Sequence, residues 1–134
     1  MVRIDHERID FMNLSDQNQN LRIDKMAVTN IQFLSEQDGA VEKQLKLQIV
    51  PILHGSNIVT RAYLARVLYG SSQSIHVALC LKVYRDVDDA LLCALSQVFT
   101  RMFKPSEHFD MLVIDDDQEA SVSKVCHAFF NRMI

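Results

Sequence analysis

The residues of this sequence whose type and spacing most suggest reactive chemistry are three consecutive aspartates, Asp115–Asp117. They follow an apolar segment of strand type, in the sequence FDMLVIDDDQ. Carboxylates at the carboxyl end of a strand can hold a divalent ion or accept a phosphoryl group. They can also begin a helix, because side-chain oxygens cap its first N–H groups and negative charge is favourable at its N-terminus.

Both interpretations can be compared with the rest of the chain. The sequence VIDDD resembles the acidic pocket of bacterial response-regulator receivers, but that pocket draws on later strands, and only residues 118–134 follow here. Capping needs no such partners. Asp115 or Asp116 would cap a final helix, and Asp117 and Glu119 would lie in its first turn. We therefore expect these aspartates to begin a helix and to hold no metal.

Histidine and cysteine form no ligand or catalytic pattern. Cys126 and His127 are adjacent on an expected helix, so their side chains diverge by about 100°. His76 and Cys80 lie roughly 13 Å apart along one expected strand. A chain with three glycines also has no Gly-x-Ser-x-Gly motif, phosphate-binding glycine loop or dinucleotide fingerprint. The sequence predicts no catalytic residue, no cofactor and no metal site.

Composition narrows the class of protein. The chain has 134 residues, the size of one domain, with 49% hydrophobic and 23% charged residues. Its net charge of −3 and its lack of a Lys/Arg cluster argue against a nucleic-acid partner. No apolar run approaches the ~20 residues of a membrane span, and the N-terminus lacks the apolar centre of a signal peptide. We expect a cytoplasmic protein without membrane contact, and buried free thiols at Cys80, Cys93 and Cys126.

The chain divides into two parts by pattern. Residues 1–23 are polar, contain NLSDQNQN and lack periodicity, which predicts an N-terminal arm. Residues 24–134 predict a single α+β domain. Its first element is an expected strand over residues 25–34, KMAVTNIQFL.

The segment after this strand is ambiguous. Some of its apolar residues fit the period of a strand: Leu45, Leu47, Ile49 and Leu53. An overlapping set fits the i, i+4, i+7, i+8 spacing of a helix: Val41, Leu45, Ile49, Ile52 and Leu53. Pro51 is unfavourable in a central strand and in a straight helix. Good helix formers and a glycine stop at Gly55 favour a helix over residues 40–54.

The next two segments, residues 59–69 and 76–84, are rich in β-branched and aromatic residues. A Gly/Ser loop joins them, which predicts an antiparallel hairpin. Residues 86–104 give the clearest helix, with Asp86 as its N-cap and Pro105 as its stop. Its unusually wide apolar stripe indicates deep burial.

A strand over residues 109–115 and a helix over residues 117–133 complete the chain. The resulting order, β-α-β-β-α-β-α, matches the split β-α-β, or ferredoxin-like, arrangement in its first six elements. The sequence therefore predicts an α+β fold: a four-stranded antiparallel sheet with helices on one face, plus a C-terminal helix.

The sheet face opposite the helices is the expected binding site. It would carry aromatic and cationic side chains from the hairpin: Arg61, Tyr63, Tyr69, His76, Lys82 and Tyr84. Tyr and Arg favour protein interfaces, so these side chains could bind a protein partner. The alternative is an ordinary solvated sheet face, or one covered by the N-terminal arm.

A longer stretch, from VTRAYLARVLYG through HVALCLKVYRDVDDALLCALSQVFTRMF to FDMLVIDDD, resembles the C-terminal domain of the bacterial enhanced-serine-sensitivity (SseB) family. The shared features are the RAYLA strand, an acidic-capped helix, a strand that begins with Phe-Asp, and a terminal aromatic pair at Phe129-Phe130. The resemblance covers residues ~25–134. It implies a cytoplasmic bacterial protein from a family without established catalytic residues.

The leading hypothesis is a non-enzymatic interaction domain that binds a protein through its sheet face, its edge strand or helix 86–104. A dimeric secretion-type chaperone or an immunity protein is the alternative within the same broad class, and a homodimer is compatible with both. A small-molecule enzyme that uses Asp115–Asp117 with a divalent ion is the alternative from a different class.

Overall fold

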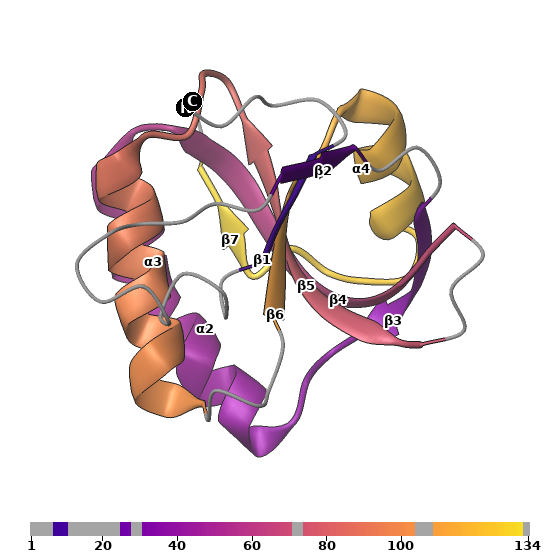
Figure 1. Cartoon of the computed structure of the whole chain (residues 1–134), viewed down its shortest axis with the longest axis horizontal. Helices are drawn as coiled ribbons and strands as arrows, with labels where there is room; N and C mark the ends of the chain where they lie inside the picture. Colours follow the sequence, from indigo (N-terminus) through magenta and orange to yellow (C-terminus); the bar gives the residue numbers. More distant parts are fainter. Residues whose placement is uncertain (1–6, 11–24, 28–30, 71–73, 104–108, 133–134) are drawn as a thin grey trace.

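The computed structural model describes residues 7–10, 25–27, 31–70, 74–103 and 109–132 (Figure 1). Its strands are β1 (Glu7–Asp10), β2 (Lys25–Ala27), β3 (Ile31–Glu36), β4 (Val59–Tyr69), β5 (His76–Val83), β6 (Phe109–Val113) and β7 (Phe130–Asn131). Its helices are α2 (Ala40–Ser56), α3 (Asp89–Met102) and α4 (Asp116–Val122). The α+β class is confirmed.

The strands form one mixed sheet in the order β2-β1-β6-β5-β4-β3, and β7 pairs with β4. β4 and β5 form the predicted antiparallel hairpin. β5 and β6 are parallel neighbours joined through α3, so the prediction of a purely antiparallel sheet is wrong. In a split β-α-β unit another strand lies between the two parallel strands, whereas here they pair directly. Element order alone does not fix which strands become neighbours, and the ferredoxin-like arrangement is not confirmed.

The ambiguous segment is helical, as predicted. It buries Leu45, Ile49 and Leu53 but leaves Leu47 67% exposed, whereas a strand would place all four side chains on one face. Pro51 lies inside α2 on its exposed side, where water can hydrate the carbonyl that loses its helical hydrogen bond. Gly55 does not end the helix. α2 continues to Ser56 and ends at Asn57, whose φ of 56° is the left-handed conformation that Asn tolerates at a helix end.

The strand predicted over residues 25–34 is instead two short strands at opposite edges of the sheet. β2 pairs with β1, and β3 pairs with β4. Residues 28–30, between them, lie outside the described residues. Within the polar segment 1–23, Glu7–Asp10 form β1, which pairs antiparallel with β6. Alternation of side chains predicts a strand but does not show where a chain leaves one edge for another.

The expected C-terminal helix is much shorter than predicted. α4 ends at Val122, and the chain then returns to β4, where Phe130–Asn131 pair with Arg61–Ala62. Phe130 is buried by this pairing, whereas Val125 is 39% exposed. Phe130–Asn131 therefore form a short strand beside β4, because strand pairing there overrides local helix propensity.

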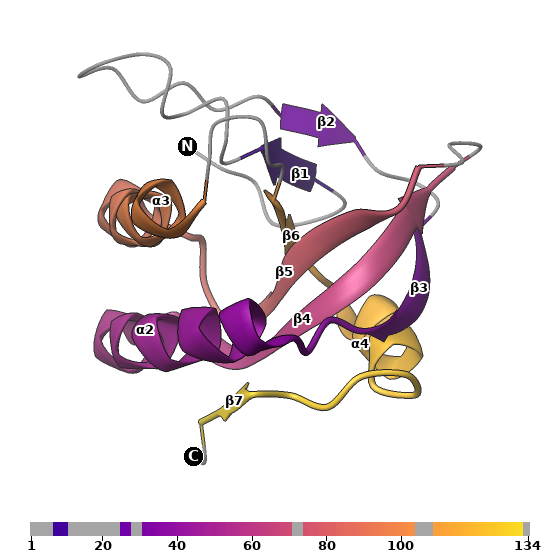
Figure 2. The same ribbon diagram turned by 90° about the horizontal axis from the view of Figure 1, so that it is seen from below.

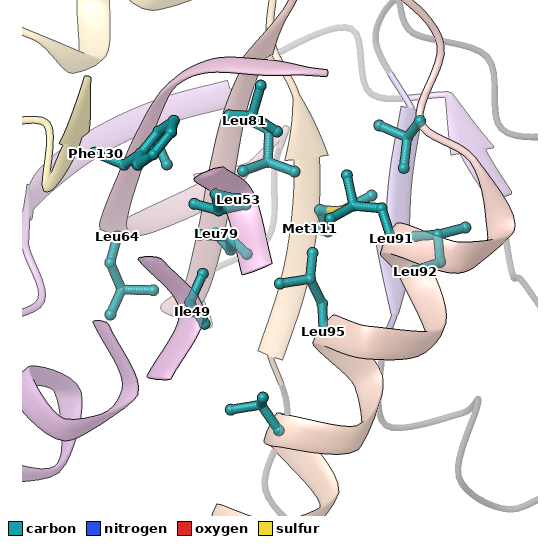
Figure 3. Close-up of a cluster of buried hydrophobic side chains, with 14 of the residues drawn as sticks. Ile49, Leu53, Leu64, Leu79, Leu81, Leu91, Leu92, Leu95, Met111 and Phe130 are labelled. Atoms are coloured by element: carbon teal, nitrogen blue, oxygen red, sulfur yellow. The ribbon is translucent and has the colours of Figure 1, made fainter. Parts of the chain in front are cut away.

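Two apolar layers cover the two faces of the sheet. Residues of α2 and α3 pack against one face, where Leu64, Leu79 and Met111 point toward them (Figure 3). On the other face, Val122 of α4 and Cys126 pack against intervening strand residues. Figure 2 shows α2 and α3 together on one side of the hairpin and α4 on the other. The two helices predicted for one face, α2 and α3, do share a face, and the C-terminal helix α4, for which no face was predicted, covers the other.

The wide apolar stripe of α3 is buried, as predicted. The side chains of both rows lie in the first apolar layer: Leu91, Leu92, Leu95, Val98 and Phe99. The N-cap is Asp88 rather than Asp86, since the Asp88 carboxylate accepts the N–H of Leu91 at 2.8 Å. Across the described ranges, no helix combines the length and apolar character that crossing a bilayer requires.

The helical assignment of α2 makes a direct prediction for two neighbouring apolar residues. Ile49→Ala should lower the free energy of unfolding by about 3 kcal/mol, because Ile49 is fully buried. Leu47→Ala, at a side chain that is 67% exposed, should change it by no more than about 0.5 kcal/mol. Chemical denaturation of both variants measures this. Equal losses would instead indicate a strand, in which both side chains share one face.

Candidate functional site

The first cluster of polar residues lies on the sheet face that the sequence predicted as a binding site. Arg61 forms a two-pronged ion pair with Glu119 of α4, through its Nε to one carboxylate oxygen and through its Nη2 to the other at 2.8 Å. The Tyr63 hydroxyl donates to the same carboxylate at 2.8 Å. Two of the six predicted residues thus hold α4 against the sheet.

A third predicted residue also binds α4. The Lys82 ammonium lies 2.8 Å from the carboxylate of Asp116. Asp115, just before it, is the N-cap, as the capping interpretation predicted. Its side chain accepts the N–H of Gln118 at 2.8 Å, and the Gln118 side chain accepts the N–H of Asp115 at 2.9 Å. Asp115 and Asp116 are thus used in forming α4 and fixing its position.

This cluster shifts the pKa values of its members in consistent directions. The hydrogen bond from Arg61 lowers the pKa of Glu119 below its ordinary 4.5, although partial burial opposes this. The hydrogen bond from Lys82 likewise lowers the pKa of Asp116. Burial, and then its hydrogen bond to Glu119, raise the pKa of Tyr63 to about 12. At neutral pH the cluster therefore contains a charged ion pair and a neutral phenol.

A second polar cluster lies farther along the same sheet face, on β4, β5 and β6. The Asp110 carboxylate is buried, accepts the Tyr69 hydroxyl at 2.9 Å and lies 3.6 Å from Nδ1 of His76. The His76 ring also packs on the Tyr69 ring, with centroids 5.1 Å apart. The structure thus brings two more predicted residues together around a carboxylate that sequence reasoning did not single out.

The thiols between these clusters are buried, in agreement with the prediction for Cys80 and Cys126. Cys93, on α3, is free but only half-buried. Burial raises the pKa of Cys80 far above its ordinary range and that of Cys126 to about 11. Because the thiolate is the reactive form, these two thiols are poor nucleophiles and poor metal ligands.

A large hollow lies elsewhere on the described surface, between α2, the end of β5 and β7. It has a volume of about 930 Å³. The residues around it are Val50, His54, Asn57, Tyr84, Phe129, Phe130, Asn131 and Arg132, and we call it the α2–β7 groove. Tyr84 is the sixth predicted residue and is 51% exposed in this groove. Its backbone N–H is fixed by the Ile58 carbonyl at 3.2 Å.

Arg132 holds the wall of the groove in place. Its Nη2 donates to the carbonyls of Leu53 and His54 at 2.9 and 3.0 Å, where α2 ends, and its Nε donates to the Val59 carbonyl at 3.1 Å. Its backbone N–H pairs with the Thr60 carbonyl at 2.7 Å. This one side chain therefore joins α2, β4 and the C-terminal segment.

Aromatic packing completes the groove. The His54 ring meets the Phe130 ring edge-on, with centroids 6.2 Å apart, and the Arg132 guanidinium lies 5.6 Å from the centre of the same ring. On the other side, the Lys46 ammonium lies 5.8 Å from the Phe129 ring. The walls of the groove are thus held by contacts within the chain.

The six predicted residues therefore separate into three places. Arg61, Tyr63 and Lys82 contact α4, Tyr69 and His76 contact Asp110, and Tyr84 lies in the α2–β7 groove. Glu119 could have been found from the sequence, since it lies one turn before the buried Val122 and shares its helix face. No sequence pattern indicated the role of Arg132, because the helix expected over residues 117–133 would have kept it away from α2 and β4.

The chemistry that these clusters allow is limited. The carboxylate of Asp110 can orient the His76 imidazole, but the hydroxyl next to this pair, that of Tyr69, donates its proton to the same carboxylate. In the ranges with described side chains, no three His, Cys, Asp or Glu residues converge on a possible metal position. The groove is the concave, largely apolar feature that could receive a ligand or a peptide.

No family model matches this sequence, and no curated protein or solved structure is similar enough to count as a match. The class of protein is therefore defined by its own geometry. It is an α+β protein with a mixed sheet, helices on both faces, and an apolar groove beside its C-terminal strand.

The Glu119 ion pair makes a prediction about stability and pH. Glu119→Gln should lower the free energy of unfolding at neutral pH by roughly 1 kcal/mol, since a partly exposed ion pair is screened by solvent. Folding lowers the pKa of Glu119, so its stabilisation is present above pH 4.5 and is lost as pH falls through the folded pKa. The difference between wild type and variant should therefore shrink in acid.

Urea denaturation at about pH 7 and about pH 3 measures this difference. The control is Asp117→Asn, which changes an exposed carboxylate in the same helical turn. A loss of equal size in the control, or one that does not depend on pH, would show that Arg61 and Tyr63 do not hold α4 through Glu119.

The phenol of Tyr63 makes a separate prediction at high pH. Because its pKa is raised to about 12, it favours the folded state up to pH 10, and this stabilisation is lost as pH rises toward 12. Phenolate absorbance should show a late ionisation near pH 12 that Tyr63→Phe removes and Tyr84→Phe retains. If Tyr63→Phe left the late step unchanged, the phenol would not be buried against Glu119.

Proposed function

We propose that this chain is a non-enzymatic protein-interaction domain that binds a partner in the α2–β7 groove. The observation that carries the proposal is the exposure of Tyr84, a large aromatic side chain that is 51% exposed at a largely apolar hollow. Aromatic side chains at the centre of such hollows contribute much of the energy of protein association.

The groove has the properties of a binding site for a protein segment. Its volume of about 930 Å³ accommodates a few side chains, and Phe129 and Phe130 provide apolar walls. Arg132 and the β7–β4 pairing fix these walls, so little conformational entropy would be lost on binding. The exposed Leu47, on the same helix, extends the apolar surface beyond the groove.

The sheet face itself is the weaker candidate. Arg61, Tyr63 and Lys82 already have partners in α4, and a protein that used them would first have to displace Glu119 and Asp116. Enzymatic use of the aspartates is weaker still, because Asp115 caps α4 and Asp116 binds Lys82. The resemblance to the SseB family, which lacks established catalytic residues, supports the same class of function, and with it a cytoplasmic location.

The proposal predicts that capture of a partner depends on Tyr84. Tagged wild-type chain should retain a stoichiometric protein from an extract of the cells that produce it, and Tyr84→Ala should weaken this retention roughly tenfold. The matched control is Ile75→Ala, a side chain that is 50% exposed just before the opposite end of β5. Quantitative mass spectrometry of the captured protein measures both.

Three outcomes are informative. Loss with Tyr84→Ala alone supports the groove. Equal retention by both variants would overturn the groove as the binding site, and loss with Arg61→Glu in its place would assign binding to the sheet face. Sedimentation of the pure chain distinguishes a second copy from a different partner.

A further inference from the structure

We propose that the occupant of the α2–β7 groove is an apolar peptide segment flanked by carboxylates, that is, an acidic and hydrophobic stretch of a partner protein. This inference rests on the proposed function and specifies the chemistry of the partner. It follows from the combination of apolar walls with an uncompensated positive charge in one hollow.

The apolar part of the occupant follows from the walls. Val50, Tyr84, Phe129 and Phe130 approach the groove from α2, the end of β5 and the C-terminal segment. A polar occupant would leave this surface without a favourable contact, whereas Leu or Phe side chains would remove it from water. The pure hydrophobic effect, however, would not distinguish one apolar segment from another.

The charged part follows from the ionisable side chains of the groove. Apart from the Tyr84 phenol, these are Arg132 and His54, and no carboxylate lies among the groove residues. The acidic residues that follow Tyr84 and Arg85 in the chain, from Asp86 to Asp89, border a separate hollow before α3. The side chains of the groove therefore include the positive charge of Arg132 and no negative charge, although the whole chain has a net charge of −3.

The bonding of Arg132 shows that its charge is not neutralised within the described chain. Its side chain makes four hydrogen bonds, three to backbone carbonyls and one, at 3.4 Å, to the side-chain oxygen of Asn57. All four acceptors are neutral groups that carry only partial charge. A guanidinium has five N–H donors, so one remains for a ligand, and a carboxylate is its best-matched acceptor.

A peptide fits these features better than a nucleic acid or a phosphate. One guanidinium and one imidazole, in a hollow lined by three aromatic rings, are too few for a polyanion, which requires an extended array of Lys and Arg. Alternating apolar and acidic side chains would place apolar groups on the aromatic walls and a carboxylate beside Arg132.

Three synthetic fluorescent peptides test the inference on the full chain. All share a Leu-Phe-Leu centre, which is flanked by aspartates in the first, by serines in the second and by lysines in the third. Fluorescence anisotropy should show that the aspartate peptide binds about fivefold more tightly than the serine peptide, and the lysine peptide more weakly than both. The preference should fall as salt is added, because exposed charges are screened.

Two variants separate the charge of Arg132 from its structural role. Arg132→Gln removes the charge, whereas Arg132→Lys keeps it, and both lose most of the hydrogen bonds to α2 and β4. Thermal unfolding reports the structural loss for each. The inference expects Arg132→Lys to retain the preference for the aspartate peptide and Arg132→Gln to lose it.

The outcomes separate this inference from the proposed function. Equal binding of all three peptides, abolished by Tyr84→Ala, would overturn the acidic preference and leave the groove as an interaction site. Binding of none would overturn the inference, while Tyr84-dependent capture would still support the function. Preference for the lysine peptide, or retention of the aspartate preference in Arg132→Gln, would show that Arg132 does not select the partner.

Discussion

The hydrogen bonds of one strand edge organise much of this structure. β3 pairs with β4 only from Ala65 onward, which leaves the carbonyls of the first half of β4 exposed on that side. The C-terminal segment satisfies them: the N–H of Phe129 bonds to the Ala62 carbonyl at 2.9 Å, and the N–H of Arg132 to the Thr60 carbonyl at 2.7 Å. A buried strand edge without partners would be costly, so Phe130–Asn131 pair with β4 as a strand instead of continuing a helix.

The pairing of the C-terminal segment with β4 determines both the covered sheet face under α4 and the α2–β7 groove. Because the chain must return to β4, α4 is short and lies across the sheet, where Glu119 meets Arg61 and Tyr63. The same return places Phe130 and Arg132 beside the end of α2 and creates the groove. One continuous segment of the chain thus covers the sheet face with α4 and forms a wall of the groove with β7; both elements are labelled in Figure 2.

The six predicted binding residues are separated because acidic residues of the same chain bind most of them. Cationic and aromatic side chains on an open sheet would be free to bind another protein, but the chain supplies acidic partners of its own. Glu119 and Asp116 occupy the positions that carboxylates of a partner would take. Such side chains stabilise the fold first, whereas Tyr84, which follows β5 and lines the groove, remains 51% exposed.

The sequence by itself determined the elements whose signals are local: the hairpin of β4 and β5, the helices α2 and α3, and the capping role of Asp115. Period, caps and turn residues act over a few positions and can be read directly. Only the tertiary structure decided the parallel pairing of β5 with β6, the division of residues 25–34 between opposite edges, the early end of α4, and the groove. These depend on hydrogen bonds and contacts between residues distant in sequence, such as Arg61 with Asn131, which no local pattern encodes.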